Sequence, residues 1–185
     1  MHRTVAILRQ GFPRAAIPAL AALLVAAGAG KAAAQESGVP PCAAPEHRQF
    51  DFWLGEWEVR TEDGQLAGTN RITKDFRDCV LREEWAGAGG GRGESLNLYD
   101  AAAGRWHQTW VDGQGRLLLL QGGLDTRRRM VLTGDRPGPG GSTVLNEISW
   151  EPRDDGSVLQ VWSVSEDAGA TWRELFRGIY TRREP

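Results

Sequence analysis

The sequence lacks the short motifs by which many enzymes are recognised. It contains no Gly-x-Ser-x-Gly nucleophile elbow, no phosphate-binding loop and no dinucleotide-binding fingerprint. The glycine-rich stretch at residues 89–93 is not followed by a helical pattern. With three histidines and two cysteines in 185 residues, the chain also shows no cluster with the spacing of metal ligands. We therefore expect no metal and no cofactor, and motifs assign no catalytic residue.

A long apolar run is missing as well. The uncharged stretch at residues 15–30 is shorter than the roughly 20 residues of a membrane-spanning helix, and Pro18 interrupts it. Three arginines precede this stretch and Ala32-Ala33-Ala34 follows it, which is typical of a cleaved signal peptide. We expect residues 1–34 to be removed, no stable membrane anchor to remain, and the protein to be periplasmic or secreted.

Positive charge is scarce in the expected mature chain. Residues 1–34 hold four basic and no acidic residues, so 18 basic residues remain against 24 acidic ones, a net charge near −6. This balance argues against nucleic acid or an anionic membrane as the main partner. The remaining length suits one domain, which we place at residues 46–185.

Cysteine is nearly absent, and the two cysteines that occur lie outside the predicted signal peptide. Disulfides persist in exported proteins, so we predict a bond between Cys42 and Cys79. Sequence spacing alone leaves two free thiols as the alternative. The polar, proline-containing residues 35–45 are then a flexible leader held by Cys42.

The rest of the chain predicts an all-β domain with one short helix near its start. Phe50, Trp53 and Leu54 have helical spacing, which predicts a helix within residues 45–54. From Gly55 onward, short β-favouring runs alternate with turn signals such as Asp63-Gly64. Strands are expected at residues 56–62, 67–77, 79–86, 94–100, 105–112, 116–123, 128–134, 143–151, 157–165 and 171–182. About ten short strands favour a closed barrel or a sandwich over a parallel α/β fold, and we predict a single antiparallel up-and-down β-barrel.

A polar residue stands two positions before a tryptophan in three of these strands. Because side chains alternate between the faces of a strand, each pair shares one face. If these faces point into a barrel, the lumen combines indole rings with amides and a carboxylate, which suits a small amphipathic or aromatic ligand. The alternative is that the tryptophans only fill the core. The pairs are Glu83-x-Trp85, Gln108-x-Trp110 and Gln160-x-Trp162.

Four side chains are candidates for acid/base chemistry: Glu83, His107, Asp112 and Glu147. No spacing motif joins them. His107 alternates with Gln108, so we expect it to face away from the tryptophans.

One local motif predicts a turn. Ser165-x-Asp167-x-Gly169-x-Thr171-Trp172 resembles the Asp-box of sialidases and other β-propellers, in which Asp and Ser cap turn amides and Trp packs under the turn. A propeller needs repeated copies, and this chain has one. We interpret the motif as a folding device rather than a sugar-binding site.

Taken together, several segments resemble a bacterial secreted domain-of-unknown-function family that is lipocalin-like and belongs to the calycin superfamily. The resemblance rests on residues 50–59, 79–85, 95–100 and 106–112 together with the Asp-box-like hairpin. It implies a β-barrel whose first strand begins at Gly55-Glu56-Trp57, and little about activity, because calycins include transporters, haem proteins and some enzymes. Haem-binding nitrobindin-like barrels carry further glycines after this element, whereas this chain continues Glu58-Val59-Arg60, so haem is not expected.

These observations favour an exported, non-enzymatic protein that binds a small molecule in its lumen. One alternative is a barrel hydrolase or isomerase that uses Glu83 as general acid or base, and another is a structural or protein-interaction domain with a filled core. The predicted ligand-binding residues are Glu83, Trp85, Asn97, Gln108, Trp110, Gln160 and Trp162.

Overall fold

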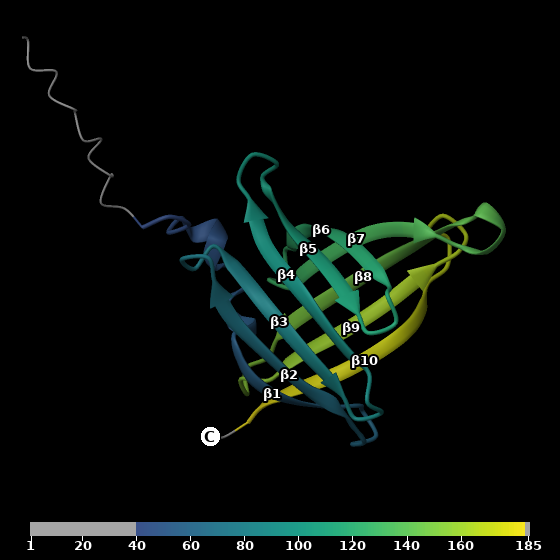
Figure 1. The fold of residues 1–185 in the computed structure, drawn as a ribbon, viewed down its shortest axis with the longest axis horizontal. Helices are drawn as coiled ribbons and strands as arrows, with labels where there is room; N and C mark the ends of the chain where they lie inside the picture. The colour runs from purple at the N-terminus through teal and green to yellow at the C-terminus, as the bar shows by residue number, and fades with distance from the viewer. Residues whose placement is uncertain (1–39, 184–185) are drawn as a thin grey trace, which may run out of the picture. The chain divides into compact units, whose positions relative to one another are not determined.

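Ten antiparallel strands follow one another along the chain, and each pairs with its sequence neighbours (Figure 1). The computed structural model describes residues 40–183. Pairing of the first strand with the last closes the sheet, so the predicted antiparallel barrel of about ten strands is confirmed. The strands are β1 (Gly55–Arg60), β2 (Leu66–Asp75), β3 (Val80–Gly87), β4 (Arg92–Asp100), β5 (Arg105–Asp112), β6 (Leu117–Leu124), β7 (Met130–Pro137), β8 (Thr143–Pro152), β9 (Val158–Ser165) and β10 (Arg173–Arg182).

The short helix predicted within residues 45–54 is present in part, as 3-10 turns. Two 3-10 helices, η1 (Pro45–Arg48) and η2 (Asp51–Trp53), occupy this segment. A segment this short makes too few helical hydrogen bonds to offset the cost of nucleating an α-helix. The burial of Phe50 and Trp53, both fully shielded from solvent, sets the path of the chain instead. A third 3-10 helix, η3 (Pro139–Gly141), lies between β7 and β8.

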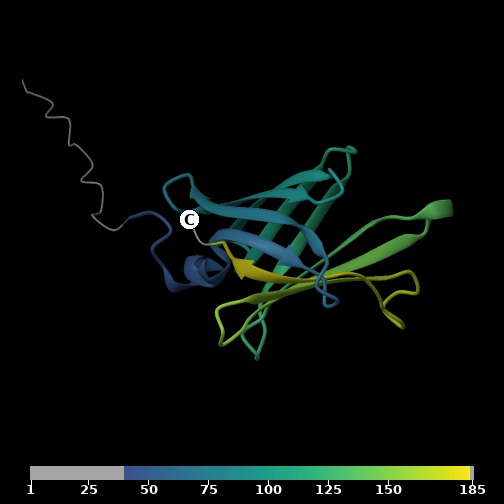
Figure 2. The same cartoon turned by 90° about the horizontal axis from the view of Figure 1, so that it is seen from below.

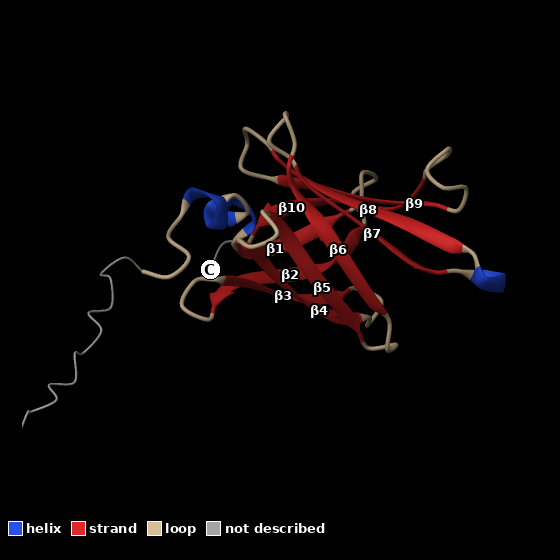
Figure 3. Cartoon of the chain, turned by 90° about the horizontal axis from the view of Figure 1, so that it is seen from above, coloured by secondary structure: helices blue, strands red, loops and turns tan. Residues whose placement is uncertain are grey.

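The barrel has two different ends, because successive strands run in opposite directions. The turns after β2, β4, β6 and β8 lie with η1 and η2 at one end, here called the plugged end. The turns after β1, β3, β5, β7 and β9 lie at the other, the distal end. Figures 2 and 3 show the β7–β8 and β9–β10 hairpins reaching away from the N-terminal 3-10 helices.

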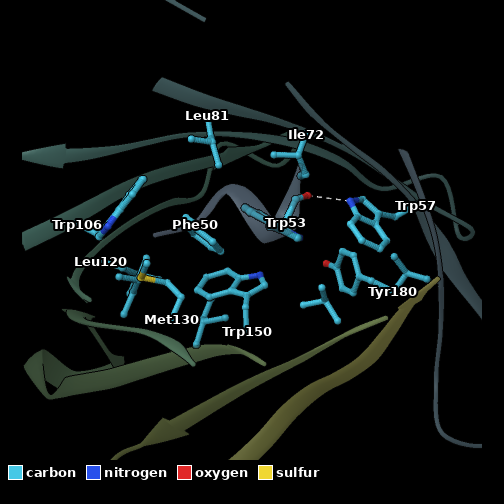
Figure 4. Close-up of a cluster of buried hydrophobic side chains, with 14 of the residues drawn as sticks. Phe50, Trp53, Trp57, Ile72, Leu81, Trp106, Leu120, Met130, Trp150 and Tyr180 are labelled. Carbon is cyan, nitrogen blue, oxygen red and sulfur yellow. Dashed lines mark hydrogen bonds between the residues drawn. The ribbon is translucent and has the colours of Figure 1, made fainter. Parts of the chain in front are cut away.

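Aromatic side chains fill the plugged end (Figure 4). Phe50 stacks on Trp53 with 4.9 Å between ring centroids. Its ring edge meets Trp106 at 5.6 Å and Trp150 at 5.2 Å. The indole of Trp57 donates a hydrogen bond of 2.9 Å to the Trp53 carbonyl. This bond joins residues 50–53, here called the plug, to the start of β1. Aromatic rings from residues 50–53, β1, β5 and β8 thus pack together in this half of the lumen.

The predicted disulfide is confirmed between Cys42 and Cys79, which are 37 residues apart. It joins the segment before the plug to the β2–β3 turn, and the Lys74 ammonium adds an ion pair of 2.8 Å to Asp51. A disulfide indicates an oxidising environment such as the periplasm or the cell exterior. The predicted signal peptide, residues 1–34, lies outside the described residues. Between residues 40 and 183, no helix has the length and apolar character needed to cross a bilayer.

The Asp-box-like turn between β9 and β10 has the predicted hydrogen bonds. Asp167 Oδ1 accepts from the Thr171 amide at 2.8 Å, and Ser165 Oγ accepts from the Gly169 amide at 2.8 Å. Gly169 has φ of +92°, a conformation that favours glycine. The expected packing of Trp172 under the turn is wrong, since this side chain is 44% exposed. The side-chain caps therefore hold the turn without the indole.

Removal of the disulfide should destabilise the fold. In the double variant Cys42→Ser/Cys79→Ser, we expect the free energy of unfolding to fall by about 4 kcal/mol, because the unfolded chain regains the freedom of the open loop. Urea unfolding without reductant measures this difference. The wild type in dithiothreitol is the control and should approach the variant. A variant with the midpoint of the oxidised wild type would contradict a structural role for the bond.

Candidate functional site

A cavity of about 300 Å³ occupies the lumen between the plug and the distal end. Six of the seven predicted ligand-binding residues lie on its wall: Glu83, Trp85, Gln108, Trp110, Gln160 and Trp162. The other wall residues are Leu118, Ile148, Trp150, Leu175, Phe176 and Tyr180. The volume is at the lower end of the range for small-molecule pockets, about 300–1,000 Å³.

Register explains why the three polar-x-Trp pairs meet. Trp162 of β9 pairs with Ile148 of β8 and with Phe176 of β10, so these three side chains share the inner face. On the opposite side of the lumen, Ser95 of β4 pairs with both Glu83 and Trp110, which brings β3 and β5 to the same level. The period-two spacing in the sequence thus places each amide or carboxyl beside its indole.

Asn97 is the predicted residue that does not line the cavity. Its side chain is fully buried, and its Oδ1 accepts a hydrogen bond of 2.7 Å from Gln108 Nε2. Its Nδ2 donates to Ser95 Oγ at 2.8 Å and to the Leu81 carbonyl at 3.2 Å. A direct contact between Asn97 and a ligand stays a prediction. Asn97 lies directly opposite Gln108 in the pairing of β4 with β5 and orients its amide.

Glu83 forms the centre of a buried polar network. Its Oε1 accepts from Asn70 Nδ2 at 2.7 Å, and its Oε2 accepts from Ser95 Oγ at 2.6 Å. Asn70 Nδ2 also lies 3.4 Å from the hydroxyl of Tyr180, which donates to Gln160 Oε1. Hydrogen bonds thus link the carboxyl on β3 to the amide on β9 across the lumen.

Burial controls the protonation of this network. Loss of hydration raises the pKa of Glu83 to about 7, although hydrogen bonds from Ser95 and Asn70 act in the opposite direction. The pKa of Tyr180 is also raised well above its ordinary value, by burial first and then by the nearby Glu83 carboxyl. Glu83 is the one carboxyl among the twelve wall residues. None of these residues is basic, so Glu83 has no cationic partner on the wall.

The indoles lie close to the barrel wall, where glycines leave room for them. A Cβ atom on Gly93 would stand 2.3 Å from Trp110 Cζ2, and one on Gly68 would stand 2.8 Å from Trp85 Cζ2. Trp162 is held differently, since its indole donates to Asn146 Oδ1 at 3.1 Å. These contacts hold the three indoles at the wall of the cavity.

Tyr180 and Phe176 contribute to the cavity although sequence reasoning missed them. Phe176-x-Gly178-x-Tyr180 has the same period of two as the other inner faces, and this pattern was the available signal. This segment lacks the polar-x-Trp pattern. Only its pairing with Gln160 and Trp162 of β9 shows which of its side chains point into the barrel.

Of the four acid/base candidates, only Glu83 reaches the cavity wall. His107 points outward, as alternation predicts, and its ring lies 2.9 Å from Thr109 Oγ1. Asp112 accepts from the Gln114 amide at 2.9 Å and caps the β5–β6 turn. Within residues 40–183, no three His, Cys, Asp or Glu side chains are near enough to one another to hold a metal ion.

A comparison of the sequence with protein-family models gives no match, and neither does a comparison with curated proteins. The function of the protein is therefore inferred from the geometry and chemistry of its cavity.

Because the folded state raises the pKa of Glu83 from 4.5 to about 7, it binds this proton more tightly than the unfolded state does. The contribution of protonated Glu83 to the free energy of unfolding is therefore fully present below pH 4.5. It falls by about 3 kcal/mol as the pH rises to about 7 and beyond. Relative to the wild type, Glu83→Gln should gain stability over this interval. Urea unfolding from pH 4 to 8 measures the difference, with Glu94→Gln on the outer face of β4 as the control for loss of one acidic group. Parallel pH profiles for wild type and Glu83→Gln would refute the assignment.

Proposed function

We propose that this protein is an exported, non-enzymatic binding protein that holds a small molecule with an aromatic or apolar body inside its barrel. The observation that carries the proposal is the cavity of about 300 Å³, whose wall combines four tryptophan or phenylalanine rings near the distal end with Glu83, Gln108 and Gln160. Membership of the secreted lipocalin-like family, which the sequence motifs suggest, is part of this proposal and agrees with a closed barrel.

The contrast between the two halves of the lumen supports binding over a filled core. The plugged half is packed with rings from η2, β1, β5 and β8. In the distal half, Trp85, Trp110, Trp162 and Phe176 remain partly exposed although they point inward. A core that served packing alone would bury these large rings, since aromatic burial is a main source of stability.

The polar groups of the wall suit a ligand that makes few, well-placed hydrogen bonds. Gln108 and Gln160 approach from opposite sides, and each amide is already oriented, by Asn97 and by Tyr180. Preoriented amides lose little entropy when a ligand binds. The apolar rings then provide affinity while the amides select the ligand's orientation.

A second candidate is a barrel enzyme, a hydrolase or isomerase, in which Glu83 is the general acid or base. A carboxyl with a pKa of about 7 at a cavity wall is suited to proton transfer near neutral pH. However, both of its oxygens accept hydrogen bonds from Asn70 and Ser95, and the residue is only 4% exposed. Proton transfer to a ligand would require one of these bonds to break, so binding is the first proposal.

The binding proposal is tested with adjacent residues that face opposite sides of β6. Leu118 lines the cavity and is 6% exposed, whereas Leu119 lies on the outer surface and is 46% exposed. Leu118→Trp should fill the lumen and abolish binding of the neutral fluorophore N-phenyl-1-naphthylamine, while Leu119→Trp should leave binding unchanged. Fluorescence titration is the measurement, and circular dichroism checks folding. Should Leu118→Trp misfold, Leu175→Trp at the edge of the cavity is the second blocking variant. Equal affinity in the blocked and unblocked proteins would rule out lumenal binding.

The two glutamines should respond differently to truncation. Gln108→Ala removes the donor to the buried Asn97 Oδ1, and we expect a loss of about 1–3 kcal/mol of stability. Gln160 is only half-buried, so water in the cavity can replace its amide, and Gln160→Ala should change stability little while weakening probe binding. Thermal unfolding and probe titration of both variants separate these effects. Strong destabilisation by both substitutions, with no probe bound by the wild type, would mean that the face is packed core.

A further inference from the structure

A second hollow, of about 490 Å³, adjoins the lumenal cavity at the distal end. The two spaces share Trp85, Trp110, Leu118 and Trp162, so they adjoin each other at these side chains. We call this outer space the vestibule. Its charged residues are Arg92, Arg116, Arg136 and Asp112.

The vestibule carries excess positive charge. Arg116 pairs with Asp112 at 2.7 Å, so these two charges largely cancel. Among residues 40–183, Arg92 and Arg136 make no ion pair within 4.0 Å. Arg136 pairs across strands with Val144, whose side chain is buried in the barrel, so it lies on the inner side of β7.

Two acidic residues that line a neighbouring hollow together with Arg92 are already paired on the outer surface. Glu84 of β3 accepts from Arg71 at 3.3 Å, and Glu94 of β4 accepts from Arg82 at 3.4 Å. The wall of the vestibule thus holds three arginines and one aspartate, in a protein whose formal net charge is −2.

The lumenal cavity deeper in the barrel offers no positive charge. Glu83 is the one carboxyl on the wall of the lumenal cavity, and none of the wall residues there is basic. An anionic group that entered the lumen would meet a carboxyl and no cation. A cationic ligand would meet two unpaired guanidinium groups in the vestibule.

We propose that the ligand is an amphipathic anion, with its apolar or aromatic body between the indoles of the lumen and its carboxylate, sulfonate or phosphate group at Arg92 and Arg136. This inference rests on the proposed binding function and adds the charge and the orientation of the ligand. Guanidinium groups suit this task because they donate two parallel hydrogen bonds to planar or tetrahedral oxyanions. The shared tryptophans connect the two sites, so one molecule can occupy both.

The effect of each arginine should be modest, because exposed ion pairs are weakened by water and salt. The apolar body supplies most of the affinity, and the arginines supply the preference for an anion. We expect about a threefold loss of anion affinity for each arginine replaced.

Two fluorophores with the same ring system test this charge preference. 8-Anilinonaphthalene-1-sulfonate carries a sulfonate, and N-phenyl-1-naphthylamine is its neutral counterpart. The wild type should bind the sulfonate more tightly at low salt and lose that preference as salt is added. Arg136→Gln and Arg92→Gln/Arg136→Gln should reduce sulfonate affinity stepwise, by about threefold and tenfold, and leave the neutral probe unaffected. Arg127→Gln, an exposed arginine in the β6–β7 turn at the plugged end, is the matched control and should behave like the wild type.

The outcomes separate this inference from the proposed function. If both probes bind and Leu118→Trp abolishes binding, but their affinity ratio is the same in the arginine variants, the anion preference is wrong and the binding function stands. If neither probe binds the wild type, or if both bind Leu118→Trp as well as the wild type, lumenal binding itself is overturned, and this inference with it. Unfolding midpoints equal to that of the wild type verify that the arginine variants are folded.

Discussion

The cavity depends on the pairing of the first strand with the last. This contact joins Val59 to Tyr180 and Trp57 to Arg182, and it is the one strand pairing that no hairpin turn promotes. The side chain of Arg182 reinforces it, since the guanidinium lies 4.5 Å from the Trp57 ring and donates to the Leu54 carbonyl at 3.0 Å. Non-local contacts of this kind cost chain entropy before they yield any stability.

Closure also creates the polar network. Asn70 and Tyr180 are 110 residues apart in sequence, and only the β1–β10 pairing brings β2 and β10 to opposite sides of β1. Without it, Glu83 would lose the low-dielectric surroundings that raise its pKa. The plug acts in the same direction, because Phe50 and Trp53 close the end of the barrel through which water would otherwise reach the network. The raised pKa of Glu83 therefore depends on both the closure of the barrel and the plug.

The strands and the polar-x-Trp faces were predictable because both rest on local patterns. Turn signals such as Asp112-Gly113 bound the strands, and alternation alone decides that Gln108 and Trp110 share a face. The role of Asn97 was not predictable, because its position opposite Gln108 depends on the register between β4 and β5. The same holds for Tyr180, whose partners come from β2 and β9. The register between strands and the closure of the barrel are properties of the whole sheet, so the sequence of a single strand does not predict them.

The helical spacing at the N-terminus was misleading for a related reason. Phe50, Trp53 and Leu54 repeat at intervals that suit one helical face, yet the barrel end and not a helix face is what buries the first two. A pattern of apolar residues reports burial, and it reports helix only where the segment is long enough to propagate. Here the disulfide at Cys42 and the start of β1 fix both ends of a short segment, so two 3-10 turns suffice to seat the rings.

Glu83 is the residue that stability alone does not explain. An amide at this position could accept from one of its neighbours and donate to the unpaired Asn70 Oδ1, with no ion to desolvate. The carboxyl instead makes the folded protein less stable as pH rises toward neutrality. Local departures from the most stable choice tend to mark functional sites, and this one lies on the wall of the cavity, opposite in sign to the arginines of the vestibule. The carboxyl in the lumen and the two unpaired arginines at the rim make the two ends of the site different, so an amphipathic anion should bind with its charged group at the rim.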